Sequence, residues 1–222
     1  MVAGLTAVRE RMVAAAVRSH RDPAEVTLVA VSKGRSVDEI MRLYDAGHRI
    51  FGENRAQELV EKAALLPADV EWHFVGSLQR RKVALARPVV SVLHSLDRQA
   101  LVDAWAAGRS PAPRALLQVN VAGEAQKHGA APADVLRLVE AATRAGIDVA
   151  GLMVIPPAPE VPEDSRRWFT DLRRIRDDIR QSHPGVVHLS MGMTDDFEVA
   201  VEEGATLIRV GRAIFDAVDT AA

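Results

Sequence analysis

The stretch VTLVAV at residues 26–31 is a short, nearly continuous apolar run, and it ends in Ser32 and Lys33. Such runs are typical of parallel strands that are buried on both faces. Seven further short apolar runs follow along the chain, at residues 49–51, 72–75, 89–93, 115–119, 149–154, 186–189 and 206–210. The pattern predicts eight strands in a parallel sheet.

Helical segments with recognisable ends separate these runs. Ser36 and Glu39 form a capping-box pattern, and Gly47 ends the helix that they begin. Further helices are expected at residues 132–146 and 165–181, one after an opening Asn54, and one between Thr194 and Gly204. An amphipathic helix over residues 1–20 precedes the first strand and does not have the pattern of a signal peptide. The alternation predicts an α/β protein, a single (β/α)8 TIM-type barrel over residues 1–222 with an extra N-terminal helix.

Composition excludes several classes of function. The 222 residues are 48% hydrophobic, carry a formal net charge of -2 and include no cysteine. Disulfides, thiolate metal sites and a cysteine nucleophile are therefore excluded, and bulk attraction to nucleic acid is not indicated. No apolar run is long enough for a membrane span, and no His, Asp or Glu spacing resembles a metal site. We expect a cytoplasmic protein without a bound metal.

Polar residues gather where the predicted strands end. Because the active sites of such barrels lie at the carboxyl ends of the strands, these residues are the candidates for function. They are Ser32 and Lys33, residues 52–54, 76 and 77, His94 and Ser95, Asn120, and residues 153–156, 190–194, 211 and 212.

Lys33 is the best-placed amine for carbonyl chemistry. The chain has only four lysines, and we expect Lys62 and Lys82 on outer helical segments and Lys127 in a loop. A partly desolvated lysine at the barrel mouth can form a Schiff base. The alternative is an ordinary surface lysine at a strand end.

The loop SMGMT at residues 190–194 joins the seventh strand to a short helix. Barrels often bind phosphate with the loops after strands seven and eight. The Ser190 hydroxyl and the backbone N–H groups of Gly192, Met193 and Thr194 could serve, provided that the two acidic residues at 195 and 196 point away. The alternative is that Thr194 only caps the helix.

Arg209, Gly211 and Arg212 follow on the eighth strand. An arginine inside a barrel needs a partner, so a salt bridge is the alternative to a ligand contact. Gly211 would allow close approach of a ligand. Elsewhere we expect His73 to pack in a strand, Trp168 and Phe169 to lie in the core, and the basic run at residues 79–82 to form a solvated helix face.

Together these segments resemble the pyridoxal 5'-phosphate homeostasis protein family (the YggS/PROSC group). The resemblance rests on several motifs in the right order: VAVSK at 29–33, FGEN at 51–54, WHFVG at 72–76, GLM at 151–153, LSMGMTDDF at 189–197 and RVG at 209–211. It implies a fold-type III barrel that binds pyridoxal 5'-phosphate (PLP).

The resemblance also implies a role for individual residues. Lys33 would hold PLP as a Schiff base, Arg209 would face the pyridine nitrogen, and Asn54 would lie near the ring. The phosphate would be held by Ser190, by the backbone amides of the next four residues, and at Gly211 and Arg212. Those four residues are Met191, Gly192, Met193 and Thr194.

The chain departs from the family pattern at four places. Gly34-Arg35-Ser36 follows Lys33, where the family often has Thr-Lys-Pro. Arg212 replaces a small hydroxyl residue, Ser77 a bulkier polar one, and Asp216 a glycine.

The resemblance favours a protein that binds PLP for intracellular homeostasis, without catalytic residues or robust turnover. The alternative is a fold-type III enzyme such as an amino-acid racemase, and a Schiff-base aldolase is more distant. Arg209 at the pyridine nitrogen would weaken the ring as an electron sink. The chain as given leaves no room for a second domain, and its one tyrosine, Tyr44, follows the first strand. PLP-dependent apo-enzymes are candidate recipients, and we expect a monomer or weak dimer.

Overall fold

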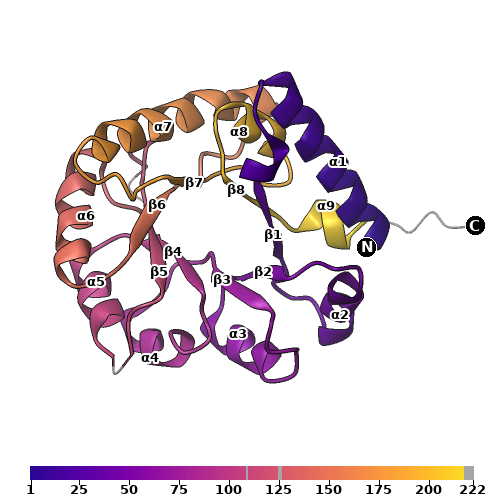
Figure 1. Ribbon diagram of the computed structural model, residues 1–222, viewed down its shortest axis with the longest axis horizontal. Helices are drawn as coiled ribbons and strands as arrows, with labels where there is room; N and C mark the ends of the chain where they lie inside the picture. The colour runs from indigo at the N-terminus through magenta and orange to yellow at the C-terminus, as the bar shows by residue number, and fades with distance from the viewer. Residues whose placement is uncertain (109, 125–126, 218–222) are drawn as a thin grey trace, which may run out of the picture.

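Eight parallel strands close into a barrel in the computed structural model, which describes residues 1–108, 110–124 and 127–217 (Figure 1). The strands are β1 (Thr27–Val31), β2 (Ile50–Glu53), β3 (Glu71–Phe74), β4 (Val92–Leu96), β5 (Arg114–Gln118), β6 (Val149–Met153), β7 (His188–Ser190) and β8 (Leu207–Val210). β8 pairs with β1 from Thr27 opposite Leu207 to Ala30 opposite Val210, which closes the barrel. The expected (β/α)8 barrel is confirmed.

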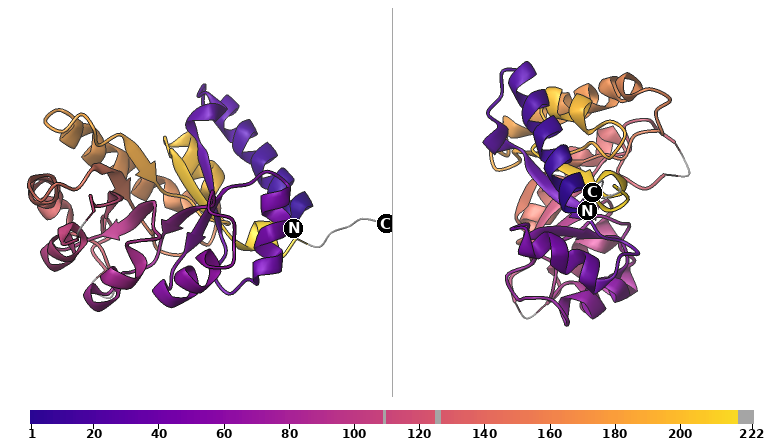
Figure 2. Two further views of the ribbon diagram at one scale, coloured as in Figure 1. Left: turned by 60° about the horizontal axis from the view of Figure 1, so that its bottom comes forward. Right: turned by 90° about the vertical axis from the view of Figure 1, so that its right-hand side faces the viewer.

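Helices surround the strands on the outside (Figures 1 and 2). They are α1 (Val2–Arg18), α2 (Val37–Asp45), α3 (Ala56–Ala63), α4 (Val83–Ala86), α5 (Gln99–Ala106), α6 (Val135–Arg144), α7 (Arg166–Arg180), α8 (Phe197–Glu202) and α9 (Arg212–Phe215). Short 3-10 turns lie at η1 (Pro23–Glu25), η2 (Arg80–Lys82), η3 (Pro132–Asp134) and η4 (Pro162–Ser165).

The N-terminal helix α1 packs along α8 and α9 and is confirmed as an addition to the barrel (Figure 1). Its buried side includes Leu5, Val8 and Met12. At the edge of this buried side, Arg11 Nη2 lies 2.9 Å from Glu198 Oε2 in an ion pair. The apolar stripe, rather than the exposed ion pair, supplies most of the stabilisation, because exposed pairs contribute about 0–1 kcal/mol.

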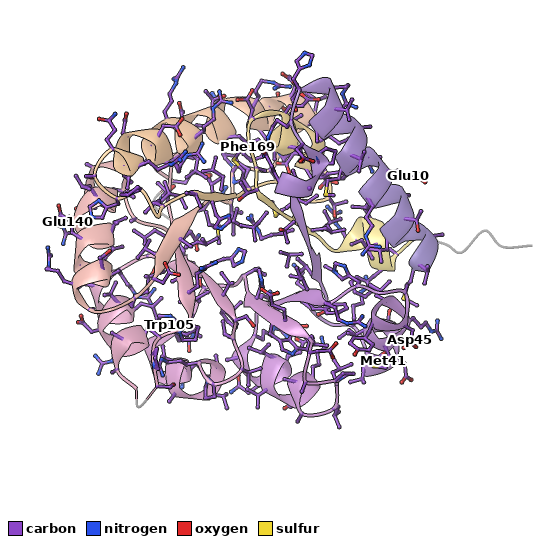
Figure 3. All side chains as sticks on the ribbon, in the orientation of Figure 1. Glu10, Met41, Asp45, Trp105, Glu140 and Phe169 are labelled. Atoms are coloured by element: carbon purple, nitrogen blue, oxygen red, sulfur yellow. The ribbon has the colours of Figure 1, made fainter. Side chains whose placement is uncertain are left out.

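The main core lies between the strands and the ring of helices. Trp105 and Phe169 are completely buried there and lie on the inner side of the helix ring, whereas Glu10 and Glu140 lie at its outer edge (Figure 3). Trp168 is only half-buried, and the Arg167 guanidinium stacks over its ring at 4.1 Å. The expectation of a core position is therefore confirmed for Phe169 and wrong for Trp168, which is partly exposed.

Two strands begin at least two residues later than predicted. The amides of Val89 and Val90 bond to the carbonyl of Ala86, so these valines complete the turn after α4, and β4 begins only at Val92. As a result His94 lies within β4, completely buried, and not at the mouth. The seventh strand also begins later than expected, at His188.

Of the three capping residues predicted at Ser36, Asn54 and Thr194, one is confirmed and two are wrong. Ser36 and Glu39 form the capping box, with the Glu39 amide donating to Ser36 Oγ at 3.2 Å. The residue at the N-cap of α3 is Arg55 and not Asn54, and that of α8 is Asp196 and not Thr194. Asn54 and Thr194 instead line a cavity at the mouth of the barrel.

None of the helices in the described ranges combines the length and the apolar character that a membrane span needs.

A cavity at the barrel mouth

A cavity of about 340 Å3 opens at the carboxyl ends of the strands. Its volume lies at the lower end of the range for small-molecule sites. Seven of the predicted site residues line it: Lys33, Asn54, Met193, Thr194, Arg209, Gly211 and Arg212. Val31, Val75 and Ile155 add apolar surface. The cavity therefore combines an amine, two guanidinium groups and an apolar wall.

Lys33 lies in the turn that follows β1, and its side chain is exposed. Gly34 has a φ of +70°, a left-handed conformation that glycine adopts without strain, and the Arg35 amide closes the turn on the Ser32 carbonyl at 3.0 Å. Within the described part of the chain, no acceptor binds the Lys33 amine. It is the one lysine that lines the cavity.

A buried charged cluster holds the Lys33 turn from behind. Lys62, which we expected on the outside, is only 6% exposed. Its Nζ donates to the Ser32 carbonyl at 2.7 Å, to Glu53 Oε1 at 2.6 Å and to Glu58 Oε1 at 2.7 Å. The expectation was wrong because Lys62 lies on the side of α3 that faces the barrel, where it meets the Glu53 carboxylate of β2.

The two carboxylates also bind the turn directly. The Ser32 hydroxyl donates to Glu53 Oε1 at 2.7 Å, and the Gly34 amide donates to Glu58 Oε1 at 2.5 Å. Burial raises the pKa of Glu53, although the bonds from Lys62 and Ser32 act against it. Burial also raises the pKa of Glu58, but the bonds from Lys62 and Gly34 outweigh it and lower that pKa. The cluster fixes the residues on both sides of Lys33.

Arg209 points into the barrel interior and reaches the floor of the cavity. Its Nη1 donates to Ser190 Oγ at 2.6 Å and its Nη2 to the Val154 carbonyl at 2.8 Å. Burial lowers its pKa to about 10, although Asp196 acts in the opposite direction, so the group remains a cation at neutral pH. The two anchors are a hydroxyl and a carbonyl, so the salt bridge considered as the alternative is not what holds this side chain.

Three of the predicted phosphate-loop residues lie beneath the cavity and not on its wall. Ser190 is completely buried, with its hydroxyl between Arg209 and His94. The Met191 amide bonds to the Leu207 carbonyl at 3.1 Å. Gly192 has a φ of +91°, and an added Cβ there would lie 2.5 Å from Ala200 Cβ.

The two acidic residues after Thr194 have different environments. Asp196 is buried and points away from the cavity, accepting from Ser165 Oγ and from the Met193 amide, both at 2.7 Å. That bond occupies the Met193 N–H, which we had counted as a free phosphate donor. Asp195 lines the cavity and pairs with Arg212 at 2.5 Å, which offsets its charge.

Asn54 brings an unsatisfied acceptor to the cavity. Its buried Oδ1 has no hydrogen-bond donor among the residues that the structure describes. Gly76 allows the Asn54 backbone to lie this close, because a Cβ on Gly76 would be 2.5 Å from the Asn54 carbonyl oxygen. A ligand with a donor group would satisfy the amide oxygen.

Two of the departures from the family pattern contact each other. The guanidinium of Arg35 forms an ion pair with the carboxylate of Asp216, and it also lies 5.3 Å from the Phe215 ring. These contacts join the segment after Lys33 to the end of α9. The Asp216 substitution therefore has a structural partner in Arg35.

A larger groove of about 890 Å3 lies beside the mouth. Lys82 lines it together with Gln79, from the basic run that we expected to be a solvated face. It shares Asn54 with the smaller cavity but contains neither Lys33 nor Arg209. The smaller cavity is therefore the better candidate for carbonyl chemistry.

Comparison with known proteins identifies the family. No family model matches the chain. A pyridoxal phosphate homeostasis protein from Aquifex aeolicus is 41% identical over 217 residues, which cover 95% of each chain. The chain belongs to the pyridoxal phosphate homeostasis protein family.

A further member of that family and a solved structure extend the comparison. The homeostasis protein of Bos taurus is 38% identical and matches 95% of this chain and 85% of its own. PipY from Synechococcus elongatus, solved with PLP bound, superposes with a TM-score of 0.79 at 36% identity, covering 94% of this chain and 99% of PipY. The fold-type III barrel and the family resemblance are confirmed.

Sequence reasoning about this homeostasis-family chain missed the residues that support the cavity. Glu58 and Lys62 stand four residues apart on α3, a spacing that favours an ion pair, and this signal was available. Nothing local indicated that Glu53 would face them, or that His94 would reach Ser190 across the barrel.

Proposed function

We propose that this chain binds PLP at the barrel mouth and holds it as a Schiff base on Lys33 for intracellular PLP homeostasis, without robust turnover. The observation that carries the proposal is the Lys33 amine, which has no partner among the residues that the structure describes and lies in the same cavity as Arg209 and Arg212. When bound, PLP supplies an aldehyde that reacts reversibly with a primary amine.

The donor set fits the three functional parts of PLP. Lys33 would take the aldehyde carbon, and Arg209 would donate to the pyridine nitrogen. Thr194, Gly211 and Arg212 would hold the phosphate on the other side of the cavity. Ser190, Met191 and Gly192 would support this site from below, Met193 would form part of its wall, and Asn54 would lie beside the ring. Family membership and the PLP-bound PipY structure support this assignment.

Arg209 also supports a function without turnover. A guanidinium that donates to the pyridine nitrogen leaves no proton on that nitrogen, which weakens the ring as an electron sink. The racemase alternative would need a second base on the opposite face. Tyr44 does not serve, because its hydroxyl donates to Asp69 Oδ1 at 2.7 Å on the surface and does not line the cavity. PLP-dependent apo-enzymes remain our candidate recipients, with the chain acting as a monomer or weak dimer in the cytoplasm.

Borohydride reduction of the PLP-loaded protein, followed by peptide mass mapping, tests the site. We expect a visible absorption band before reduction and the adduct on Lys33. An adduct mainly on Lys62, Lys82 or Lys127 would overturn the assignment.

Turnover needs a separate test. The loaded protein is incubated with L-alanine and other L-amino acids in deuterated water, and the products are separated on a chiral column. We expect no D-isomer above the level of free PLP. Robust D-isomer formation that disappears in Lys33→Ala would favour the racemase.

A further inference from the structure

A chain of buried hydrogen bonds crosses the interior of the barrel. It runs from Arg209 Nη1 to Ser190 Oγ (2.6 Å), on to His94 Nδ1 (2.8 Å), from His94 Nε2 to His73 Nδ1 (2.9 Å), and from His73 Nε2 to Glu71 Oε1 (3.1 Å). β4 and β7 are separated by two strands, so the bond between His94 and Ser190 spans the lumen. This line of hydrogen bonds thus connects the start of β3 with the cavity at the mouth.

The two ends of this chain determine its direction. A guanidinium can only donate hydrogen bonds, and a carboxylate can only accept them. Ser190 Oγ therefore accepts from Arg209, and His73 Nε2–H donates to Glu71. Among the arrangements in which both rings are neutral, a single one satisfies every bond between them: Ser190 O–H donates to His94 Nδ1, and His94 Nε2–H donates to His73 Nδ1. In that arrangement each ring carries its proton on Nε2.

Burial makes other arrangements unfavourable. Ser190 and His94 are completely buried and His73 is 2% exposed, so a reversed bond would leave a hydrogen or a lone pair unsatisfied and without water. Burial lowers the pKa of His94 well below its usual value, and His73, Arg209 and His188 act in the same direction. Three further charged groups act on members of this line or on His188: Asp196 acts on Arg209, Arg114 acts on Glu71 and His188, and Asp148 acts on His188.

We propose that His73 and His94 are positioning residues for Arg209, acting through Ser190 as two neutral Nε2–H tautomers. The Ser190 hydroxyl accepts a hydrogen bond from Arg209 in one fixed orientation, because its own hydrogen is donated to His94. With the bond to the Val154 carbonyl, this holds the guanidinium at two nitrogens. The tautomers are a property of the protein alone, whereas the effect on the ligand rests on the proposed function.

The first test needs no ligand. Long-range proton–nitrogen NMR spectra of cofactor-free protein with 15N-labelled histidine identify the protonated nitrogen of each ring. We expect Nε2–H for both His73 and His94 at neutral pH. A Nδ1–H tautomer or an imidazolium at either residue would overturn the proposal.

The second test compares Ser190→Ala with Ser95→Ala. Ser95 is also buried, next to His94 on β4, but its Oγ has no hydrogen-bond partner in the described part of the chain. Because Arg209 would face the ring, Ser190→Ala should weaken binding of PLP and of pyridoxal by the same factor, about five- to tenfold. Ser95→Ala should change neither.

Each other result has a defined meaning. If Ser190→Ala loses affinity for PLP but not for pyridoxal, Ser190 contacts the phosphate and does not position Arg209. That result would overturn the proposal. Equal affinities for the two serine variants would overturn it as well. If the wild-type protein forms no PLP adduct, the proposed function fails, and the NMR result still decides the tautomers.

Discussion

The ammonium group of Lys62 lies 2.7 Å from the carbonyl oxygen of Ser32, the residue directly before Lys33. One lysine, buried and bound to two carboxylates, therefore holds the backbone that presents another, exposed lysine to the cavity. The two amines have opposite environments although they lie on the two sides of one turn.

Lys62→Met should destabilise the protein by about 3–5 kcal/mol, because it leaves the Glu53 carboxylate buried without its cation. Urea unfolding followed by circular dichroism measures this loss. The double variant Lys62→Met with Glu53→Gln should recover part of it, since the uncompensated charge is then removed. Additive losses in the two variants would contradict the pairing.

Lys33→Ala should leave the free energy of unfolding within about 0.5 kcal/mol of wild type, because the side chain is exposed and has no protein partner in the described ranges. The same variant should lose the PLP absorption band. Lys82→Ala is the matched control, since Lys82 lines the neighbouring groove, and it should keep the band. A large stability loss in Lys33→Ala would mean that the amine has a structural role.

Asp195→Asn should strengthen PLP binding by up to about fivefold, because it removes an anion beside the proposed phosphate position and releases Arg212. Spectroscopic titration with PLP and with pyridoxal separates the phosphate contribution. Pyridoxal affinity should not change. Weaker PLP binding would show that the pair with Asp195 is needed to orient Arg212.

Stability should fall as the pH drops from 6.5 toward 4, and His48 contributes to this loss. Its Nε2 donates to the Ile50 carbonyl at 2.8 Å, and burial lowers its pKa to about 4. The unfolded chain takes up a proton near pH 6.5 while the folded chain does not, which costs about 1.4 kcal/mol per pH unit over that window. Thermal or urea unfolding in His48→Gln should show a shallower dependence. A dependence in His48→Gln as steep as that of the wild type would contradict this role of His48.

Gly151→Ala should destabilise the barrel by about 1–3 kcal/mol, because the added Cβ would lie 2.1 Å from the His188 carbonyl oxygen. β6 and β7 would have to move apart at this position. Gly185 has open space around its Cβ position, so Gly185→Ala should have little effect. Similar melting temperatures for the two variants would contradict the close approach of the strands.

Local signals in the chain predicted the elements that depend on local chemistry. The apolar runs, the capping box at Ser36 and the family motifs led to the barrel, to Lys33 and to the cavity residues Arg209 and Gly211. One failure also has a local cause. Val89 and Val90 are β-branched residues, which favour strands. Their amides nevertheless bond to the Ala86 carbonyl, so the end of the helix overrides their strand propensity.

Closure of the barrel decided what local patterns could not. From its sequence position, Lys62 is expected to be a surface lysine. In the barrel it faces Glu53 of β2, and both charges can be buried only because they pair. His73 and His94 are 21 residues apart, and Ser190 lies a further 96 residues along the chain, yet they share one line of hydrogen bonds. The bond between His94 and Ser190 crosses the lumen, so these two residues meet only when the barrel closes.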